Sequence, residues 1–283
     1  MSVQNHHLAA KIVSNGIEIH FNEYGQGPLL VLLHGFPDVE ETFLHQANEL
    51  KKHYRVVTPR LRGFPPSSVP NAVSSYALPE LAGDIKNLIE EFGGPAIIVG
   101  HDWGGAIAQL TALLYPDLVC GLVLCNSPLI SRFDALVNSD EEQQTLSSYT
   151  LPYFRYQEGD EKRIPEIVEP IRDEAWRAYI ADYLSSNPIE GMLSYYKANF
   201  PQPPYMPTEP SGYVFNTPTL IIWGREEHAF SSKALDGAIQ FFPAGLTIAS
   251  IPNAGHWVHR DAPEIFNKTL KSWLSTLSES HTN

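Results

Sequence analysis

The stretch Gly100-His101-Asp102-Trp103-Gly104-Gly105 decides the fold of this chain. The apolar run 95–99 precedes it, and the helix-like run 106–115 follows it and ends at Pro116. We therefore expect a buried strand to enter a tight turn that leads directly into a helix. Glycines on both sides of Asp102 leave the room that a strand and a helix need to approach closely around a strained residue.

Asp102 occupies the central position of a glycine-x-nucleophile-x-glycine turn, the nucleophile elbow. Serine is the usual residue at that position, and it acylates on carbonyl substrates. A carboxylate instead attacks saturated carbon and becomes an alkyl ester. An aspartate that only caps the following helix is the structural alternative, but the glycine spacing favours a nucleophile.

Composition narrows the class of protein. The chain has 283 residues, 43% of them hydrophobic, and a net charge of −13 without a basic run, so we expect no nucleic-acid partner. The apolar runs are far shorter than the ~20 residues of a membrane span, and residues 1–10 lack the order of a signal peptide. Cys120 and Cys125 should face opposite sides of one strand, which disfavours a bridge and fits a cytoplasmic location.

Strand patterns and helix patterns alternate along most of the chain. Asn15-Gly16 separates two short apolar runs and indicates a hairpin. Further strands are indicated by the runs 29–33, 54–58, 118–124, 219–223 and 246–251. Helical patterns occupy 40–52, 78–92, 232–241 and 263–277. This alternation predicts an α/β fold with a mainly parallel sheet that is covered on both faces.

The segment between 129 and 213 interrupts the alternation once. It is rich in Tyr, Pro and acidic residues, and its patterns indicate helices at 141–156, 164–171, 174–185 and 189–200. We therefore divide the chain into a core of residues 1–128 and 214–283 and a helical cap of residues 129–213. Because ligands bind outside the carboxyl ends of the strands in open α/β sheets, we expect the cap to cover a site there.

Two further side chains are expected beside Asp102. His256 follows a strand and precedes the last helix, which is the place of the general base in chains that run nucleophile, acid, base. Glu226 and Glu227 follow the strand that ends at 223, and either of them can orient an imidazole. A solvated charged loop is the alternative for at least one of the two.

The loop His34-Gly35-Phe36-Pro37 follows another buried strand. Its glycine lets the backbone approach the site closely. We expect the backbone N–H of Phe36 and that of Trp103, the residue after the nucleophile, to form an oxyanion hole. Packing alone would also explain the side chain of Phe36.

Tyrosines of the cap are candidate proton donors, because a phenol donates to an oxygen that becomes an alkoxide. Three of them would share one face of a helix that continues past Pro152, and two adjacent ones lie on the last cap helix: Tyr149, Tyr153 and Tyr156, then Tyr195 and Tyr196. Most of the 13 tyrosines must pack or face solvent.

These motifs together resemble the epoxide hydrolases of the α/β-hydrolase superfamily over nearly the whole chain. The matching stretches are His34-Gly35-Phe36-Pro37-Asp38, Arg62-Gly63-Phe64, Gly100 to Gly105 and Gly255-His256-Trp257. The resemblance implies that Glu227 is the acid, at a position where the family usually has Asp. It also implies that Tyr153 and Tyr196 hold the epoxide oxygen, with Tyr149 and Tyr156 left open as alternatives to Tyr153.

The resemblance implies a reaction in two halves that yields a vicinal diol. Asp102 would open a small apolar epoxide while Tyr153 and Tyr196 protonate its oxygen, and water activated by His256 and Glu227 would then cleave the ester. Substrate contacts are expected from the loop and the elbow, namely His34, Phe36, Pro37 and Trp103. No metal and no organic cofactor is expected, and the sequence does not set an oligomeric state.

Three other functions use the same pocket. A haloalkane- or haloacid-type dehalogenase would share Asp102 and His256 and would hold the halide with indole N–H groups of Trp103 and Trp176. Such enzymes usually carry Asn or Glu at the position of Phe36, which disfavours this alternative. The others are hydrolysis of an ester or lactone and a catalytically silent binding protein.

Overall fold

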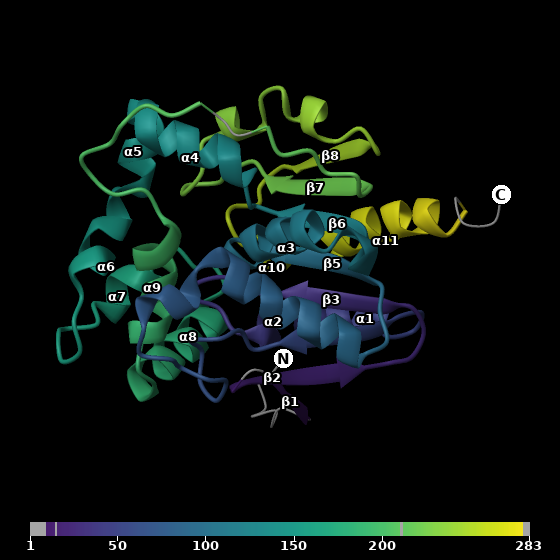
Figure 1. Ribbon diagram of the computed structural model, residues 1–283, viewed down its shortest axis with the longest axis horizontal. Helices are drawn as coiled ribbons and strands as arrows, with labels where there is room; N and C mark the ends of the chain where they lie inside the picture. Colours follow the sequence, from purple (N-terminus) through teal and green to yellow (C-terminus); the bar gives the residue numbers. More distant parts are fainter. Residues whose placement is uncertain (1–9, 15, 210–211, 280–283) are drawn as a thin grey trace.

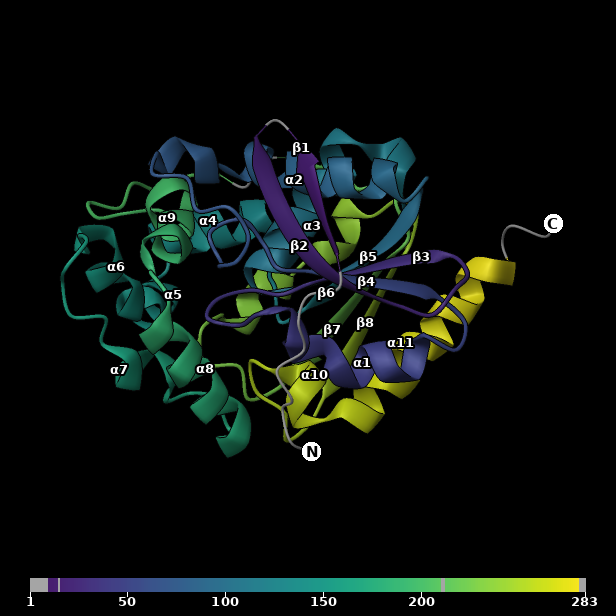
Figure 2. The same ribbon diagram turned by 90° about the horizontal axis from the view of Figure 1, so that it is seen from below.

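The computed structural model describes residues 10–14, 16–209 and 212–279, and Figures 1 and 2 show its elements. Within these residues, eight strands form one sheet in the order β1-β2-β4-β3-β5-β6-β7-β8. The β1–β2 and β2–β4 pairs are antiparallel, and the other pairs are parallel. The strands are β1 (Ala10–Ser14), β2 (Ile17–Tyr24), β3 (Leu29–Leu33), β4 (Arg55–Pro59), β5 (Ala96–His101), β6 (Val119–Cys125), β7 (Thr219–Gly224) and β8 (Leu246–Ile251). The predicted α/β fold with a mainly parallel sheet is confirmed, and Asn15 of the predicted hairpin lies outside the described residues.

Helices cover both faces of this sheet, as Figure 2 shows. Successive side chains of β3 point to opposite faces. Leu30 and Leu32 share one apolar cluster with α1 (Leu44–Leu50) and α11 (Pro263–Glu279), whereas Val31 and Leu33 share another with α2 (Leu78–Glu91) and α3 (Trp103–Leu114). Burial on both faces is the reason that the central strands read as unbroken apolar runs. The remaining core helices are η1 (Glu40–Phe43), η2 (Val73–Tyr76), η3 (Pro116–Leu118), η5 (Ser232–Leu235), η6 (Ala238–Phe241) and α10 (Val258–Asp261).

The two cysteines differ from the prediction. Both Cys120 and Cys125 are free, but they pack against the same apolar cluster, on the face of α1 and α11. The register between β5 and β6 shifts at Ala96 and Ile97, so that β6 carries one extra residue there. Such a bulge resets the alternation of faces along the strand, and the prediction of opposite faces was therefore wrong.

Between β6 and β7 the chain forms α4 to α9, which gather at one end of the sheet in Figures 1 and 2. The elements are α4 (Ile130–Ser139), α5 (Glu141–Leu146), η4 (Ser147–Thr150), α6 (Leu151–Arg155), α7 (Ile164–Val168), α8 (Glu174–Ser186) and α9 (Glu190–Asn199). The helix α4 was not predicted, although its sequence contains the apolar residues Ile130, Phe133, Ala135, Leu136 and Val137. We propose that this segment, 129–213, is the cap of a core formed by 1–128 and 214–283.

Three predicted helices are divided into shorter pieces, and the first of them, 40–52, consists of η1 and α1. The segment 141–156 divides into α5, the 3-10 turn η4 and α6, and it keeps Tyr149 and Tyr153 side by side, with ring centroids 5.9 Å apart, whereas Tyr156 follows the end of α6. The segment 232–241 divides into η5 and η6 at Gly237, whose φ of 65° lies outside the helical region. A search of the described residues finds no helix with the length and apolar character of a membrane span.

Candidate functional site

Asp102 lies at the tip of the turn between β5 and α3, with φ 51° and ψ −122°. Residues other than glycine rarely adopt this conformation. Close packing around the turn holds it: a Cβ on Gly104 would stand 2.2 Å from the carbonyl oxygen of Leu33, and a Cβ on Gly35 would stand 2.3 Å from Oδ1 of Asp102. The turn thus fixes the Asp102 carboxyl beside the loop that follows β3.

The two carboxyl oxygens of Asp102 have different surroundings. The backbone N–H of Phe36 donates to Oδ1 at 2.9 Å, whereas Oδ2 faces Nε2 of His256 at 3.8 Å. Burial raises the pKa of Asp102 to about 6, against the lowering effects of His256 and of the Trp103 and Phe36 N–H groups. Asp102 is therefore mostly ionised at neutral pH, and Oδ2 is the oxygen left to react.

His256 is held from behind by Glu227. Its Nδ1 lies 2.8 Å from Oε2 of Glu227, which also accepts a hydrogen bond from Nδ2 of Asn126 at 2.6 Å. Oε1 of Glu227 accepts from the backbone N–H groups of His228 and Ala229 at 2.8 and 2.7 Å. This network fixes the carboxylate of Glu227 and, through it, the plane of the imidazole.

The electrostatics of His256 follow from these contacts. Burial lowers the pKa of His256, but the negative charges of Glu227 and Asp102 overcome that effect and raise the pKa to about 9. For Glu227 the two effects have the opposite signs. Burial alone would raise its pKa, but the neighbouring imidazolium outweighs burial, and the pKa of Glu227 is lowered overall. Glu227 therefore stays ionised and stabilises the protonated imidazole.

The structure distinguishes between the two candidate acids. Glu226 is exposed and pairs with Arg172 at 2.8 Å, on the outside of the loop. Glu227 is turned inward and contacts His256. Asn126, which orients Glu227, was not among the predicted site residues. The available signal was its position, since a polar residue directly after a buried strand such as β6 lies at the carboxyl edge of the sheet.

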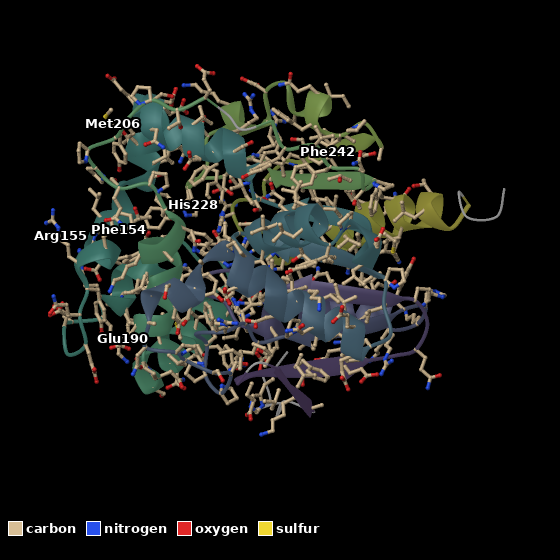
Figure 3. The ribbon with its side chains drawn as sticks, in the orientation of Figure 1. Phe154, Arg155, Glu190, Met206, His228 and Phe242 are labelled. Atoms are coloured by element: carbon tan, nitrogen blue, oxygen red, sulfur yellow. The ribbon has the colours of Figure 1, made fainter. Side chains whose placement is uncertain are left out.

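Two cavities adjoin the Asp102 carboxyl. One has a volume of about 70 Å³ and the other about 460 Å³, and Asp102, Tyr149 and Tyr196 line both. The larger cavity also contacts His256 and His228. Figure 3 shows His228 between the cap helices and the sheet. Both cavities therefore lie where the nucleophile elbow meets the cap helices.

The candidate tyrosines occupy different places. Tyr149 and Tyr196 adjoin Asp102 in both cavities, whereas Tyr153 lines only the larger one, with its ring 5.0 Å from that of Tyr196. Burial raises the pKa of Tyr149 and of Tyr196 well above the ordinary value, and the charge of Asp102 adds to both shifts. Tyr149, left open by the sequence, is therefore better placed than Tyr153 to face the carboxylate.

Tyr195 and Tyr156 lie away from the carboxylate. The hydroxyl of Tyr195 donates to the backbone carbonyl of Arg62 at 2.6 Å, which docks α9 on the core. Tyr156 is buried beside a separate hollow of the cap, and its backbone carbonyl accepts a hydrogen bond from Lys197. Both of these tyrosines serve the packing of the cap.

The four residues expected to contact the substrate do not all lie at the cavities. Phe36, Pro37 and Trp103 line the cavities, but His34 lines neither of them. The His34 ring is fully buried: Nδ1 donates to the carbonyl of Gly35 at 2.9 Å, and Nε2 accepts from the N–H of Leu61 at 3.1 Å. Burial lowers the pKa of His34 to about 3. Both ring nitrogens of His34 therefore fix the backbone of the loop, and its predicted contact with substrate has no support from these cavities.

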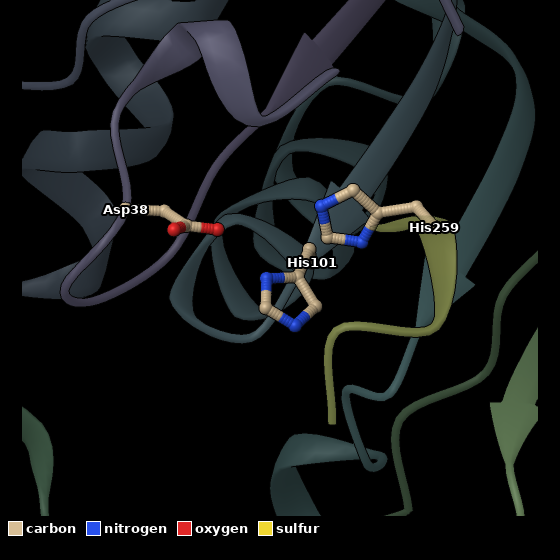
Figure 4. A group of neighbouring side chains, drawn as sticks. All are labelled: Asp38, His101 and His259. Atoms are coloured by element: carbon tan, nitrogen blue, oxygen red, sulfur yellow. The ribbon is translucent and has the colours of Figure 1, made fainter. Parts of the chain in front are cut away.

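Figure 4 shows Asp38, His101 and His259, a buried group whose potential ligand atoms lie within 4.8 Å of one another. Each of the three makes hydrogen bonds, although Nδ1 of His101 and Nδ1 of His259 have no hydrogen-bond partner among the described residues. Asp38 accepts from the indoles of Trp176 and Trp257 at 2.8 and 3.0 Å, His101 donates to the carbonyl of His256 at 3.0 Å, and His259 contacts Thr42 at 2.8 Å. The group supports the backbone behind the imidazole. Asp38 also accepts the indole N–H of Trp176, so this N–H is not free to hold a halide.

Comparisons with known proteins agree with this geometry. The family model described as the alpha/beta hydrolase fold matches residues 28–263. Epoxide hydrolase 4 of Homo sapiens is 30% identical over 292 residues, which cover 95% of this chain and 78% of the relative. Epoxide hydrolase 3 of Xenopus tropicalis is 30% identical over 300 residues, which cover 96% of this chain and 79% of the relative.

Solved structures give the same result. The structure of a Bacillus megaterium epoxide hydrolase in complex with an inhibitor superposes with a TM-score of 0.82 at 27% identity, and the match covers 94% of this chain and 100% of that one. Fold, elbow and sequence similarity therefore converge: the chain belongs to the epoxide hydrolase family of the α/β-hydrolase fold.

Proposed function

We propose that this protein hydrolyses an epoxide to a vicinal diol through a covalent ester on Asp102. The main support is the carboxyl itself. Its Oδ1 accepts the Phe36 N–H at 2.9 Å, and its Oδ2 faces both a cavity and an imidazole that Glu227 holds at 2.8 Å. The relatives named epoxide hydrolases at about 30% identity support the choice of an epoxide as substrate.

In the first half-reaction, Oδ2 of Asp102 attacks one epoxide carbon. The bond from that carbon to the epoxide oxygen breaks, and the oxygen takes a proton from a tyrosine as its charge develops. We propose Tyr149 and Tyr196 as the two donors, in place of the Tyr153 that the sequence favoured, because both adjoin Asp102 in both cavities. Their raised pKa values keep the phenols protonated at neutral pH.

In the second half-reaction, water attacks the ester carbonyl while His256 takes one of its protons. The charge that develops on Oδ1 is stabilised by the N–H groups of Phe36 and Trp103. Collapse of this intermediate expels the diol oxygen, which takes the proton back from His256. The proton left on the Asp102 carboxyl returns to the tyrosinate. Glu227 stabilises the imidazolium while it exists.

Only the epoxide and water take part in this scheme, and no step of it requires a metal or an organic cofactor. The apolar residues of the smaller cavity support a substrate with apolar groups. The two free thiols, Cys120 and Cys125, support a reducing compartment. We propose a cytoplasmic location on that ground, which localisation of a tagged protein tests directly.

The covalent step is tested by two substitutions in parallel. Asp102→Asn should abolish diol formation. His256→Gln should form the ester but fail to cleave it, so that intact-protein mass spectrometry shows one added mass equal to the epoxide. Asp102→Asn in the same experiment is the control and should show no adduct. Diol formation by Asp102→Asn at the wild-type rate would contradict the proposal.

A further inference from the structure

The two cavities meet at the reacting groups and differ strongly in size. We call the cavity of about 70 Å³ the narrow arm and the cavity of about 460 Å³ the wide arm. Asp102, Tyr149 and Tyr196 are common to both linings. An epoxide ring held by these three groups therefore stands at the junction, and the substituents on its two carbons point into different arms.

The narrow arm is built for a compact apolar group. Its apolar lining comprises Leu78, Ala106, Ile130, Phe133, Phe200 and Phe230. Of the polar side chains there, Ser127 and Asn199 are bonded within the protein, and the carboxylate of Asp134 accepts a long hydrogen bond of 3.4 Å from Thr208. Ser127 donates to the carbonyl of Asp102 at 2.9 Å, and Asn199 bonds the backbone of Leu78 and Tyr76, at 2.8 Å each. A polar substituent placed in this arm would lose its hydrogen bonds with water and gain few in return.

The wide arm offers polar partners along its wall. Arg163 and Glu166 form an ion pair at 3.2 Å with both side chains more than half exposed, and Ser148 and His228 are exposed beside them. Because the two charges of the pair compensate each other, the wall favours neutral hydrogen-bonding groups over a net charge. The larger volume also admits a longer chain.

We infer that the preferred substrate is an epoxide substituted on both carbons, with a compact apolar group in the narrow arm and a longer, neutral polar chain in the wide arm. This inference rests on the proposed function and adds the substrate class to it. Unequal arms also fix the orientation of the ring. The same carbon then always faces Oδ2 of Asp102, so attack occurs at one carbon.

Three probes test the inference. The first is a trans epoxide with an ethyl group on one carbon and a hydroxyalkyl chain on the other. The second lacks the ethyl group, and the third carries an alkyl chain of equal length without the hydroxyl. We expect each loss to lower kcat/KM about tenfold or more, since one or two methylenes or a hydrogen bond are worth that much in a fitted pocket. Over many turnovers in heavy-oxygen water, the label passes first into the Asp102 carboxyl and from there should enter the diol at one carbon only.

Two matched substitutions test whether the ethyl group binds in the narrow arm and the hydroxyalkyl chain in the wide arm. Ala106→Phe fills the narrow arm and should remove the advantage of the ethyl group, so that the probes with and without ethyl give equal kcat/KM. Ser148→Phe narrows the wide arm and should leave the ethyl effect intact while it weakens the preference for the hydroxyalkyl chain. Melting curves verify that both variants fold, and Ala106→Val is the milder substitute.

The outcomes separate the two claims. Equal kcat/KM for all three probes, or label divided evenly between the two carbons, overturns the substrate class but leaves epoxide hydrolysis standing. Equal loss on every probe in Ala106→Phe overturns the assignment of the narrow arm. Absence of diol from every epoxide, with a folded enzyme, overturns the proposed function itself.

Discussion

At the scale of single residues, the two titrating groups of the site limit the pH range of the reaction. The nucleophile must be ionised, and burial raises the pKa of Asp102 to about 6. Since kcat/KM reports the free enzyme, it should fall about tenfold per unit of pH below about 6 as Asp102 becomes protonated. A pH profile of diol formation from 4 to 8 measures this. If kcat/KM stayed constant down to the ordinary pKa of an aspartate, the raised pKa of Asp102 would be contradicted.

The ester changes the charge beside His256. In the free enzyme, the anions Glu227 and Asp102 raise the pKa of His256 to about 9. Alkylation removes the charge of Asp102, so the pKa of the imidazole should fall below 9, and neutral His256 becomes available as a base at lower pH. Decay of the ester in single turnovers should therefore rise with pH through an apparent pKa below 9. An unchanged value would mean that Asp102 does not carry the ester.

The tyrosines give a prediction on which sequence and structure differ. Tyr149→Phe and Tyr196→Phe should each lower kcat/KM by about a hundredfold or more, as expected for loss of a proton donor. Tyr153→Phe should change it less than about fivefold and serves as the matched control. Steady-state kinetics on one epoxide compare all three. A larger loss in Tyr153→Phe than in Tyr149→Phe would restore the assignment from the resemblance.

The sequence predicted site residues best where the residue closely follows a strand. Asp102 and Glu227 each come after a run whose apolar character marks a buried strand, and His256 follows the edge strand β8. Parallel strands bring such residues to one edge of the sheet. Tyr149 could not be chosen in this way. The helical spacing places Tyr149 and Tyr153 side by side, with ring centroids 5.9 Å apart, and therefore cannot decide which of the two adjoins Asp102 in both cavities.

At the scale of elements, the contact between α3 and β3 is the tightest constraint on the elbow. Gly104→Ala would put a Cβ 2.2 Å from the carbonyl oxygen of Leu33, which is backbone and cannot rotate away. We expect a loss of about 1–3 kcal/mol or more in the free energy of unfolding. Gly83→Ala in α2 is the control, because its Cβ meets open space. It should stabilise the helix by up to about 1 kcal/mol, and urea unfolding of both variants tests the pair.

Strands were easier to predict from the sequence than helices, because the central strands are buried on both faces. A central strand buried on both faces needs an unbroken apolar run, and few other elements of that length do. Helix α4 is amphipathic in sequence but buries only Ser131, Ala135 and Val137, and the prediction missed it. The bulge in β6 left no clear trace in the sequence, because it depends on how β5 and β6 pair rather than on either strand alone.

At the scale of the whole molecule, buried hydrogen bonds dock the cap on the core. The indole of Trp176 in α8 donates to Oδ1 of Asp38 at 2.8 Å, the hydroxyl of Tyr183 donates to the carbonyl of Pro65 at 2.8 Å, and Tyr195 adds the bond to Arg62. Each of these donors lies on a cap helix and each acceptor in the core. We therefore expect the cap and the core to unfold together in a single urea transition.

Trp176→Phe tests this docking through its pH dependence. Burial raises the pKa of Asp38, and the two indoles are among the groups that oppose the shift. Loss of one donor penalises the ionised carboxyl, by about 1–3 kcal/mol for a buried acceptor left unsatisfied. Because the ionised carboxyl accepts a stronger hydrogen bond than the neutral one, it loses more when the indole is removed, and the destabilisation should grow as pH rises. A loss of packing alone would be the same at every pH. Urea midpoints of wild type and Trp176→Phe at pH 5 and 8 separate the two causes, and an equal difference at both would show that the indole contributes packing rather than a hydrogen bond between cap and core.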